Sequence, residues 1–88
     1  MFTIMVSMQV SINDPIRVAV VFVGGELKPV WFDWKGRQVR VKETAFTWTT
    51  RQGNAEIMHF SVTDGINLYE ISFDRWSMSW SLTFTEVI

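Results

Sequence analysis

The sequence predicts an all-β protein, and two observations support this fold class. Bulky apolar and small polar residues alternate along residues 76–85, and the same alternation runs through residues 2–12. The segments between them are short and are separated by turns rich in Gly, Asp and Pro. Successive side chains of a strand point to opposite sides, so alternation indicates strands with two unlike faces. We predict about seven antiparallel strands in a strongly curved sheet that closes into a small barrel.

The first two predicted strands lie on either side of a turn. Residues 2–12 carry apolar side chains at every even position, and Asn13-Asp14-Pro15 should end this strand because Pro lacks a ladder donor. Residues 16–23 are apolar on both faces apart from Arg17, which suits an interior strand. Gly24-Gly25 then supplies the positive φ of a tight reversal.

The third strand covers residues 27–34. Because Pro29 cannot donate a ladder hydrogen bond, the strand either begins near Pro29 or lies at an edge of the sheet at that point. Lys35-Gly36 makes the next turn, because Gly tolerates the left-handed conformation of a short hairpin.

The fourth strand begins at Arg37 with Val39 and Val41 facing inward. Phe46 and Trp48 lie at even positions, whereas Val39 and Val41 lie at odd positions. If all four of these side chains face one core, a bulge near residues 43–45 must shift the register. A short helical turn over residues 44–50 is the alternative. Arg51-Gln52-Gly53-Asn54 closes the segment.

The last three strands follow from further apolar rows. Met58, Phe60 and Val62 form one inner row, and Asp64-Gly65 is a strong two-residue hairpin signal that pairs this strand with the next. That next strand carries a row of Tyr69, Ile71 and Phe73. Asp74-Arg75 turns the chain into the final strand.

The final strand should present an apolar wall of Trp76, Met78, Trp80, Leu82 and Phe84. We expect its row of hydroxyls to face water, with a partner subunit as the alternative, and we expect this strand to pair with the N-terminal strand and close the barrel. The predicted core consists of Phe32, Trp34, Val39, Val41, Phe60, Val62, Tyr69, Ile71, Trp80 and Leu82.

Composition limits the class of protein. The 88 residues make one domain, which needs a rich core, and 48% of them are hydrophobic and 15% aromatic. The absence of Cys excludes a disulfide framework and agrees with a reducing compartment. A net charge of −1 gives no global basic field for nucleic acid or anionic membrane. With no signal-peptide pattern in residues 1–12 and no long apolar run, we expect a cytoplasmic protein without a membrane partner.

No set of residues predicts catalysis, a metal or a cofactor. His59 is the only histidine and has no acidic or Cys spacing pattern beside it, so we interpret it as an outward or hydrogen-bonded side chain. The serines lie in no nucleophile motif, and Gly24 and Gly25 do not complete a phosphate loop. Asp64, Asn67 and Glu70 miss the spacing of a calcium loop. We therefore expect a protein that is not an enzyme.

One charge feature predicts a surface. Five of the eight basic residues fall within residues 28–42, beside two tryptophans. The candidate surface for nucleic acid or a partner consists of Trp31, Lys35, Arg37, Arg40 and Lys42, with Lys28 nearby. Basic side chains beside an aromatic ring are the ingredients of a single-strand nucleic-acid surface. A solvated face with cross-strand pairs to Glu56, Glu70 or Glu86 explains the cluster equally well.

Several segments together resemble one known family. They are the run Pro-Val-Trp-Phe-Asp-Trp-Lys-Gly-Arg-Gln-Val-Arg-Val at residues 29–41, then Trp48, His59-Phe60-Ser61-Val62, Leu68-Tyr69-Glu70-Ile71, Asp74-Arg75 and Trp80-Ser81-Leu82. They resemble a small bacterial all-β domain family of unknown function that carries Pro-x-x-Phe-x-Trp-x-Gly-Arg, a downstream Trp, Tyr-Glu-Leu and a closing Trp-x-Leu. The resemblance spans residues 17–82, so residues 1–15 lie outside it.

Members of that family occur alone or at the C-terminal end of proteins similar to Y-family translesion polymerases. The resemblance therefore implies an accessory module for interaction or nucleic-acid contact, and it implies no catalytic residue.

Three functional hypotheses follow. The first is a non-enzymatic protein-interaction module that self-associates, for example as a homodimer, because the aromatic content exceeds what one small core needs. The second is weak binding of single-stranded nucleic acid through the basic cluster. The third is a small ligand-binding barrel or enzyme, which a polar pocket holding His59 with a carboxylate would favour.

Overall fold

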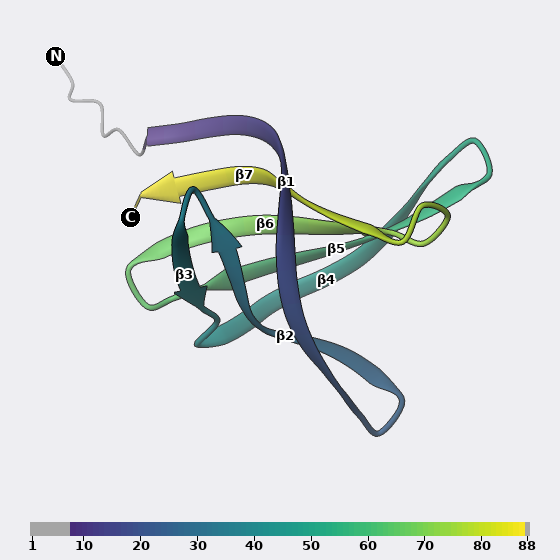
Figure 1. Cartoon of the computed structure of the whole chain (residues 1–88), viewed down its shortest axis with the longest axis horizontal. Helices are drawn as coiled ribbons and strands as arrows, with labels where there is room; N and C mark the ends of the chain where they lie inside the picture. Colours follow the sequence, from purple (N-terminus) through teal and green to yellow (C-terminus); the bar gives the residue numbers. More distant parts are fainter. Residues whose placement is uncertain (1–7, 88) are drawn as a thin grey trace, which may run out of the picture.

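The computed structural model describes residues 8–87, and over this range the chain forms one seven-stranded antiparallel sheet. Figure 1 shows the strands. They are β1 (Met8–Val23), β2 (Glu26–Trp34), β3 (Arg37–Arg40), β4 (Glu43–Gln52), β5 (Ala55–Thr63), β6 (Asn67–Asp74) and β7 (Ser79–Val87). Their order across the sheet is β3-β2-β1-β7-β6-β5-β4. The predicted all-β class is confirmed.

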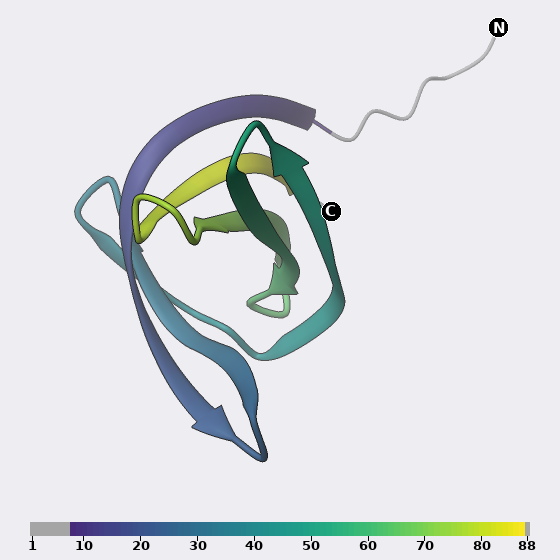
Figure 2. The same cartoon turned by 90° about the vertical axis from the view of Figure 1, so that its right-hand side faces the viewer.

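The sheet curls strongly into a half-barrel, which is plain in the end-on view of Figure 2. The short connection between β3 and β4 links the two ends of the sheet. The backbone N–H of Val41 donates to the carbonyl of Val30 on β2, at 3.0 Å, and that of Lys42 donates to Thr63 on β5, at 2.7 Å. Two consecutive amides therefore hold together strands from opposite ends of the sheet order.

The first strand does not end where the sequence predicted. β1 continues through Asn13-Asp14-Pro15, with a register shift between Ser11 and Asp14. Up to Ile16 it pairs with β7, and from Arg17 onward it pairs with β2. Pro15 is still paired with Ser81 of β7, and β2 has no residue opposite it, because pairing with β2 begins at Arg17. Pro15 therefore has a partner strand on one side only, and a proline is tolerated at such an edge position. The predicted pairing of the first and last strands is confirmed, but the two strands are neighbours in the middle of the sheet order, so their pairing does not close a barrel. Residues 2–7 of the predicted strand lie outside the described range.

The predicted fourth strand is two strands, β3 and β4. A register shift does occur between Thr44 and Phe46, but it does not turn the aromatic side chains inward. Thr47 is paired with the core residue Phe60, so Phe46 and Trp48 lie on the opposite face and are 69% and 39% exposed. The condition attached to the predicted bulge, that Phe46 and Trp48 face the same core as Val39 and Val41, is therefore not met.

The last strand begins at Ser79, so the predicted apolar wall is shorter than expected. Trp76 and Met78 lie in the turn before it and are each 71% exposed. The turn is held by Asp74, whose carboxylate accepts from the backbone N–H of Trp76 at 2.8 Å and of Ser77 at 3.1 Å. A register shift between Glu70 and Ile71 then places Phe84 opposite Glu70, on the outer face. Only Trp80 and Leu82 of the predicted wall face the core.

All ten predicted core residues contribute to the hydrophobic core. Seven are buried and form one cluster, and Trp34, Val41 and Trp80 pack against it. Tyr69 lies at the centre of this core, with its ring edge-on to Phe32 at 5.2 Å and to Trp34 at 6.3 Å between centroids.

The predicted tight turns are also confirmed. Gly24 and Gly25 have φ of 59° and 80°, and Lys35 and Gly36 have φ of 51° and 75°. Positive φ at both central residues matches the right-handed twist of the flanking strands. The Asp64-Gly65 hairpin joins β5 to β6 as predicted, but three residues rather than two separate these strands.

Candidate functional site

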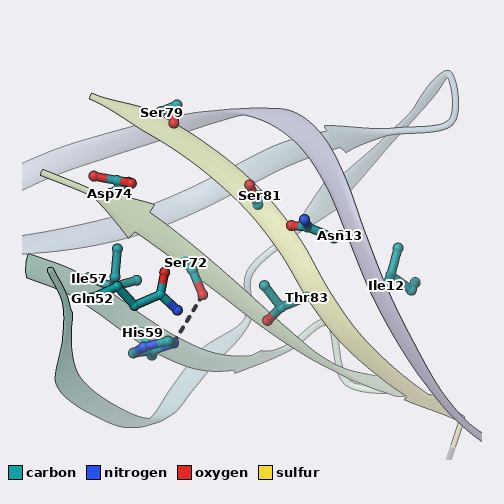
Figure 3. A pocket seen from close by; sticks show the side chains of 10 residues that line it. All are labelled: Ile12, Asn13, Gln52, Ile57, His59, Ser72, Asp74, Ser79, Ser81 and Thr83. Carbon is teal, nitrogen blue, oxygen red and sulfur yellow. Dashed lines mark hydrogen bonds between the residues drawn. The ribbon is translucent and has the colours of Figure 1, made fainter. Parts of the chain in front are cut away.

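A polar hollow of about 430 Å³ lies on the outer face of the sheet (Figure 3). On β5 to β7 the core side chains point inward, so the alternate residues of the same strands form this outer face. The residues that line the hollow are Ile12, Asn13, Gln52, Ile57, His59, Ser72, Asp74, Ser79, Ser81 and Thr83. Five strands thus contribute hydroxyl, amide, imidazole and carboxylate groups to one site.

His59 is fully hydrogen-bonded in this hollow. Its Nδ1 lies 3.0 Å from the hydroxyl of Ser72, and its Nε2 lies 2.7 Å from the hydroxyl of Thr50. Its ring stacks on Trp48, with centroids 5.0 Å apart and planes at 7°. Partial burial lowers the pKa of His59 below its ordinary value, although the negative charge of Glu70 opposes this effect. A neutral imidazole, with one nitrogen donating and the other accepting, satisfies both hydroxyls.

The carboxylate of the hollow does not complete a catalytic set with His59. Asp74 uses its Oδ1 to cap the turn before β7, and the described residues show no hydrogen bond between it and the imidazole. The imidazole nitrogen that a carboxylate would orient is instead bound by Thr50. The contact between Ser72 and His59 is therefore a pair of hydrogen-bonded side chains without the third group of a triad.

The hydroxyl row of the last strand lies partly in this hollow. Ser79, Ser81 and Thr83 line it, and the hydroxyls of Thr83 and Thr85 donate to backbone carbonyls of β6 at 3.2 and 3.4 Å. Sequence reasoning identified the row but not the hollow, because the other lining residues come from distant segments.

The five residues of the predicted basic surface do not converge. Arg40 lies directly opposite Trp31 on the outer face, whereas Arg37 shares the inner side with Val39. Lys35 places its ammonium 5.3 Å from the ring centroid of Trp34, and Lys42 lies against Gly65 of the β5–β6 hairpin.

The basic residues also do not form the expected cross-strand ion pairs. Among residues 8–87 the ion pairs are Arg17 with Asp33, at 2.7 Å, and Arg75 with Glu56. The cluster in the sequence is therefore neither one groove nor an ion-paired face.

An apolar groove of about 590 Å³ lies between the β1–β2 hairpin and the strands β5 to β7. Its lining includes Phe22, which is 75% exposed at the hairpin, and Met78 of the turn before β7. In Figure 1 this hairpin projects from the body of the sheet. The groove could not be predicted, because Met78 was expected within the final strand.

The edge strand β4 is a further surface that the sequence analysis missed. It is the last strand in the sheet order, and all ten of its residues are exposed. The sequence presents Phe46 and Trp48 only as side chains that a bulge could turn toward the core, and it does not identify an edge strand here.

We compared the chain with known proteins. No family model matches it. Comparisons with curated proteins and with solved structures also found no match. Within residues 8–87 no cluster of three or more acidic, His or Cys side chains is arranged to hold a metal ion. Over the same residues there is no helix of the length and apolarity that crossing a membrane requires.

Proposed function

We propose that this protein is a non-enzymatic interaction module that self-associates. The observation that carries the proposal is the set of large apolar side chains that are exposed although the core is complete without them. They are Val21, Phe22, Val23, Phe46, Trp48, Ile66, Trp76 and Met78. Phe22 and Met78 line one apolar groove, and Phe46 and Trp48 lie on one face of the edge strand β4. Exposed apolar side chains that gather in this way are typical of sites where another protein binds.

The energetics favour covering these side chains. Burying a large apolar side chain fully is worth about 1.5–3 kcal/mol, so a few of them offset the entropy lost when two chains associate. Long-range repulsion between two copies is small, because the net charge is −1. Self-association through this surface should therefore persist at high salt.

The non-enzymatic part of the proposal is supported by the geometry around His59. Both ring nitrogens are bound by hydroxyls, and Asp74 is occupied by its own turn. The residue best suited to act as a general base therefore has no free nitrogen and no carboxylate to orient it.

Light scattering coupled to size-exclusion chromatography tests the proposal. At tens of micromolar we expect a mass of two or more chains, which falls toward one chain on dilution and changes little with added salt. A strict monomer at these concentrations would contradict it.

A second candidate function, binding of a small polyhydroxylated molecule, is favoured by the polar hollow. Asn13, Gln52 and Ser81 line it with amide and hydroxyl groups for which no side-chain hydrogen bond within the described residues was found. Such groups can exchange hydrogen bonds with a sugar hydroxyl.

Titration with millimolar glucose, followed by the ring signals of His59, tests this second function. We expect the signals to shift in the native protein and to shift less in Ser81→Val. If neither millimolar glucose nor a millimolar disaccharide shifts the His59 signals, binding of a small sugar is contradicted.

A further inference from the structure

We propose that a second copy of this chain adds to the free edge of β4, so that the two half-barrels join into one continuous antiparallel sheet. The two-fold axis passes through the pair formed by Thr47 and the same residue of the second copy. This inference rests on the proposed self-association and specifies its surface and register.

Among the strands of residues 8–87, β4 has a neighbour on one side only, so its outer edge presents backbone groups without a partner strand in a known pattern. Gln52 and Ala55 flank a two-residue turn whose first residue, Gly53, has φ of 61°. The two residues that flank such a turn form a hydrogen-bonded pair, in which the N–H of each donates to the C=O of the other. Along β4, every second residue forms the same kind of pair with β5. Counting back from Gln52, the N–H and C=O groups of Thr47, Thr49 and Arg51 therefore point away from β5.

The usual protections of an edge strand are missing from most of β4. Natural edges are short, or carry Pro, Lys or a bulge. β4 has its bulge near its start, between Thr44 and Phe46, and residues 46–52 continue in regular pairing with β5 and contain no Pro or Lys. An exposed edge of this kind is a template for another strand.

The opposite edge of the sheet does not offer the same template. β3 has four residues, two of which are the arginines Arg37 and Arg40. The neighbouring part of β2 already uses the carbonyl of Val30 to accept from Val41. Pairing of β3 with β4 would also leave edges free for endless addition, whereas pairing of β4 with β4 closes as a dimer.

The sequence of β4 is complementary to itself in the antiparallel direction. With Thr47 on the axis, Phe46 lies opposite Trp48 of the second copy, and symmetry makes this aromatic pair occur twice. Both side chains lie on the outer face of the sheet, where they are exposed. Glu43 begins the strand and Arg51 lies near its end, so the antiparallel direction brings opposite charges near each other. A parallel arrangement would place like charges together.

Single cysteine variants test the register, because the natural chain contains no Cys. Thr47→Cys places two thiols on the axis in a backbone-bonded pair, where Cα atoms are about 5.5 Å apart, within the range of a disulfide. We expect rapid formation of a covalent dimer under mild oxidation.

Thr49→Cys is the matched control on the same strand and face. Its thiol is offset by four residues from the same thiol of the second copy, which is about 13 Å. This variant should stay uncrosslinked while reacting with a thiol reagent as readily as Thr47→Cys. Cross-linking of Thr49→Cys in preference to Thr47→Cys would overturn the register.

Thr49→Pro tests the edge itself without touching the bonds between β4 and β5. Proline removes an outward N–H, so we expect a monomer by light scattering with a melting temperature close to that of Thr49→Ala, which should stay dimeric. A dimer that survives Thr49→Pro and is not cross-linked by Thr47→Cys would overturn the β4 interface but leave self-association standing, with the apolar groove as its next site. A natural chain that is strictly monomeric would overturn both.

Discussion

At the scale of single residues, His59 shows how a lone titratable side chain becomes part of the structure. Hydroxyls bind both of its nitrogens and Trp48 stacks on its ring, so charging it would require the hydroxyl that donates to the neutral ring to turn and accept instead. Its partial burial also disfavours the charged ring and lowers the pKa of His59.

We therefore predict that His59 titrates below the ordinary value of about 6.5. Because it is the only histidine, its ring signals in a proton NMR titration need no assignment. A lowered folded pKa also means that stability falls as the pH drops below about 6.5, since the unfolded chain then binds more protons. His59→Gln should flatten this dependence, and a titration above 6.5 would contradict the hydrogen-bonded neutral ring.

Asp64 is the second residue whose protonation is linked to the fold. Burial by itself would raise the pKa of its carboxyl, but hydrogen bonds from the backbone N–H groups of Asn67 and Ile66 and from the hydroxyl of Tyr69 outweigh it. The pKa of Asp64 therefore lies below its ordinary value.

We predict that this carboxylate stabilises the fold at neutral pH and that its contribution is lost in acid. A lowered folded pKa gives stability that is present above the unfolded value of about 3.9 and disappears as the pH falls through the folded value. Asp64→Ala should lose about 1–3 kcal/mol at pH 7, measured by urea unfolding. Asp64→Asn should show a weaker loss of stability below pH 4 than the native chain, with Glu26→Gln as a control for removing one exposed charge.

At the scale of elements, the turn before β7 decides how much of the last segment is strand. The alternation of residues 76–85 would allow a longer strand, but Asp74 accepts two backbone N–H groups and holds residues 75–78 as a turn. Met78 then adopts φ of 59°, a region that side chains with a Cβ rarely occupy. Its side chain is largely exposed and gains little packing in return.

We predict that Met78→Gly stabilises the protein by about 0.5–1 kcal/mol, because glycine adopts this conformation without the steric cost. Ser79→Gly, one residue later in the regular strand, should destabilise by a similar amount. Urea midpoints of the two variants measure both effects. A loss of stability in Met78→Gly would show that its side chain packs more than its exposure indicates.

Strand boundaries were the weakest part of the sequence-based prediction, and Pro15 explains why. A proline ends a strand only where its missing N–H has a partner strand to bind, and that depends on the neighbours present at its position. Just after Pro15, β1 stops pairing with β7 and begins to pair with β2. No local sequence pattern predicts this change of partner strand.

At the scale of the whole molecule, the fold separates two kinds of aromatic residue. Phe32 is completely buried between strands of the core, and Phe46 is 69% exposed on the edge strand. The sequence predicts Phe32 in the core and leaves the orientation of Phe46 dependent on a register shift, so only the structure separates the two.

We predict that Phe32→Ala costs about 3–5 kcal/mol of unfolding free energy, because it leaves a cavity in a complete core. Phe46→Ala should cost less than about 1 kcal/mol in dilute solution, where the chain is monomeric, and should weaken self-association at higher concentration. Denaturant unfolding at low concentration, together with light scattering, separates the two effects. Equal destabilisation by both substitutions would contradict the assignment of Phe46 to the outer face.

The sequence by itself determined the all-β class, the two-residue turns at Gly24-Gly25 and Lys35-Gly36, and all ten predicted core residues. These features are local: alternation with a period of two residues separates the faces of a strand, and Gly or Asp sets a turn over a few residues. Tyr69, Ile71 and Leu82 could therefore be assigned to the core from their own segments.

Only the tertiary structure decided what lies on the other face. The polar hollow needs five strands to be brought together, the basic cluster is divided by the two faces of β3, and Trp48 is turned outward by its pairing with His59. Register and sheet curvature depend on contacts between residues far apart in the sequence, and a shift of one residue reverses every side chain. The candidate surfaces of this protein are products of that pairing.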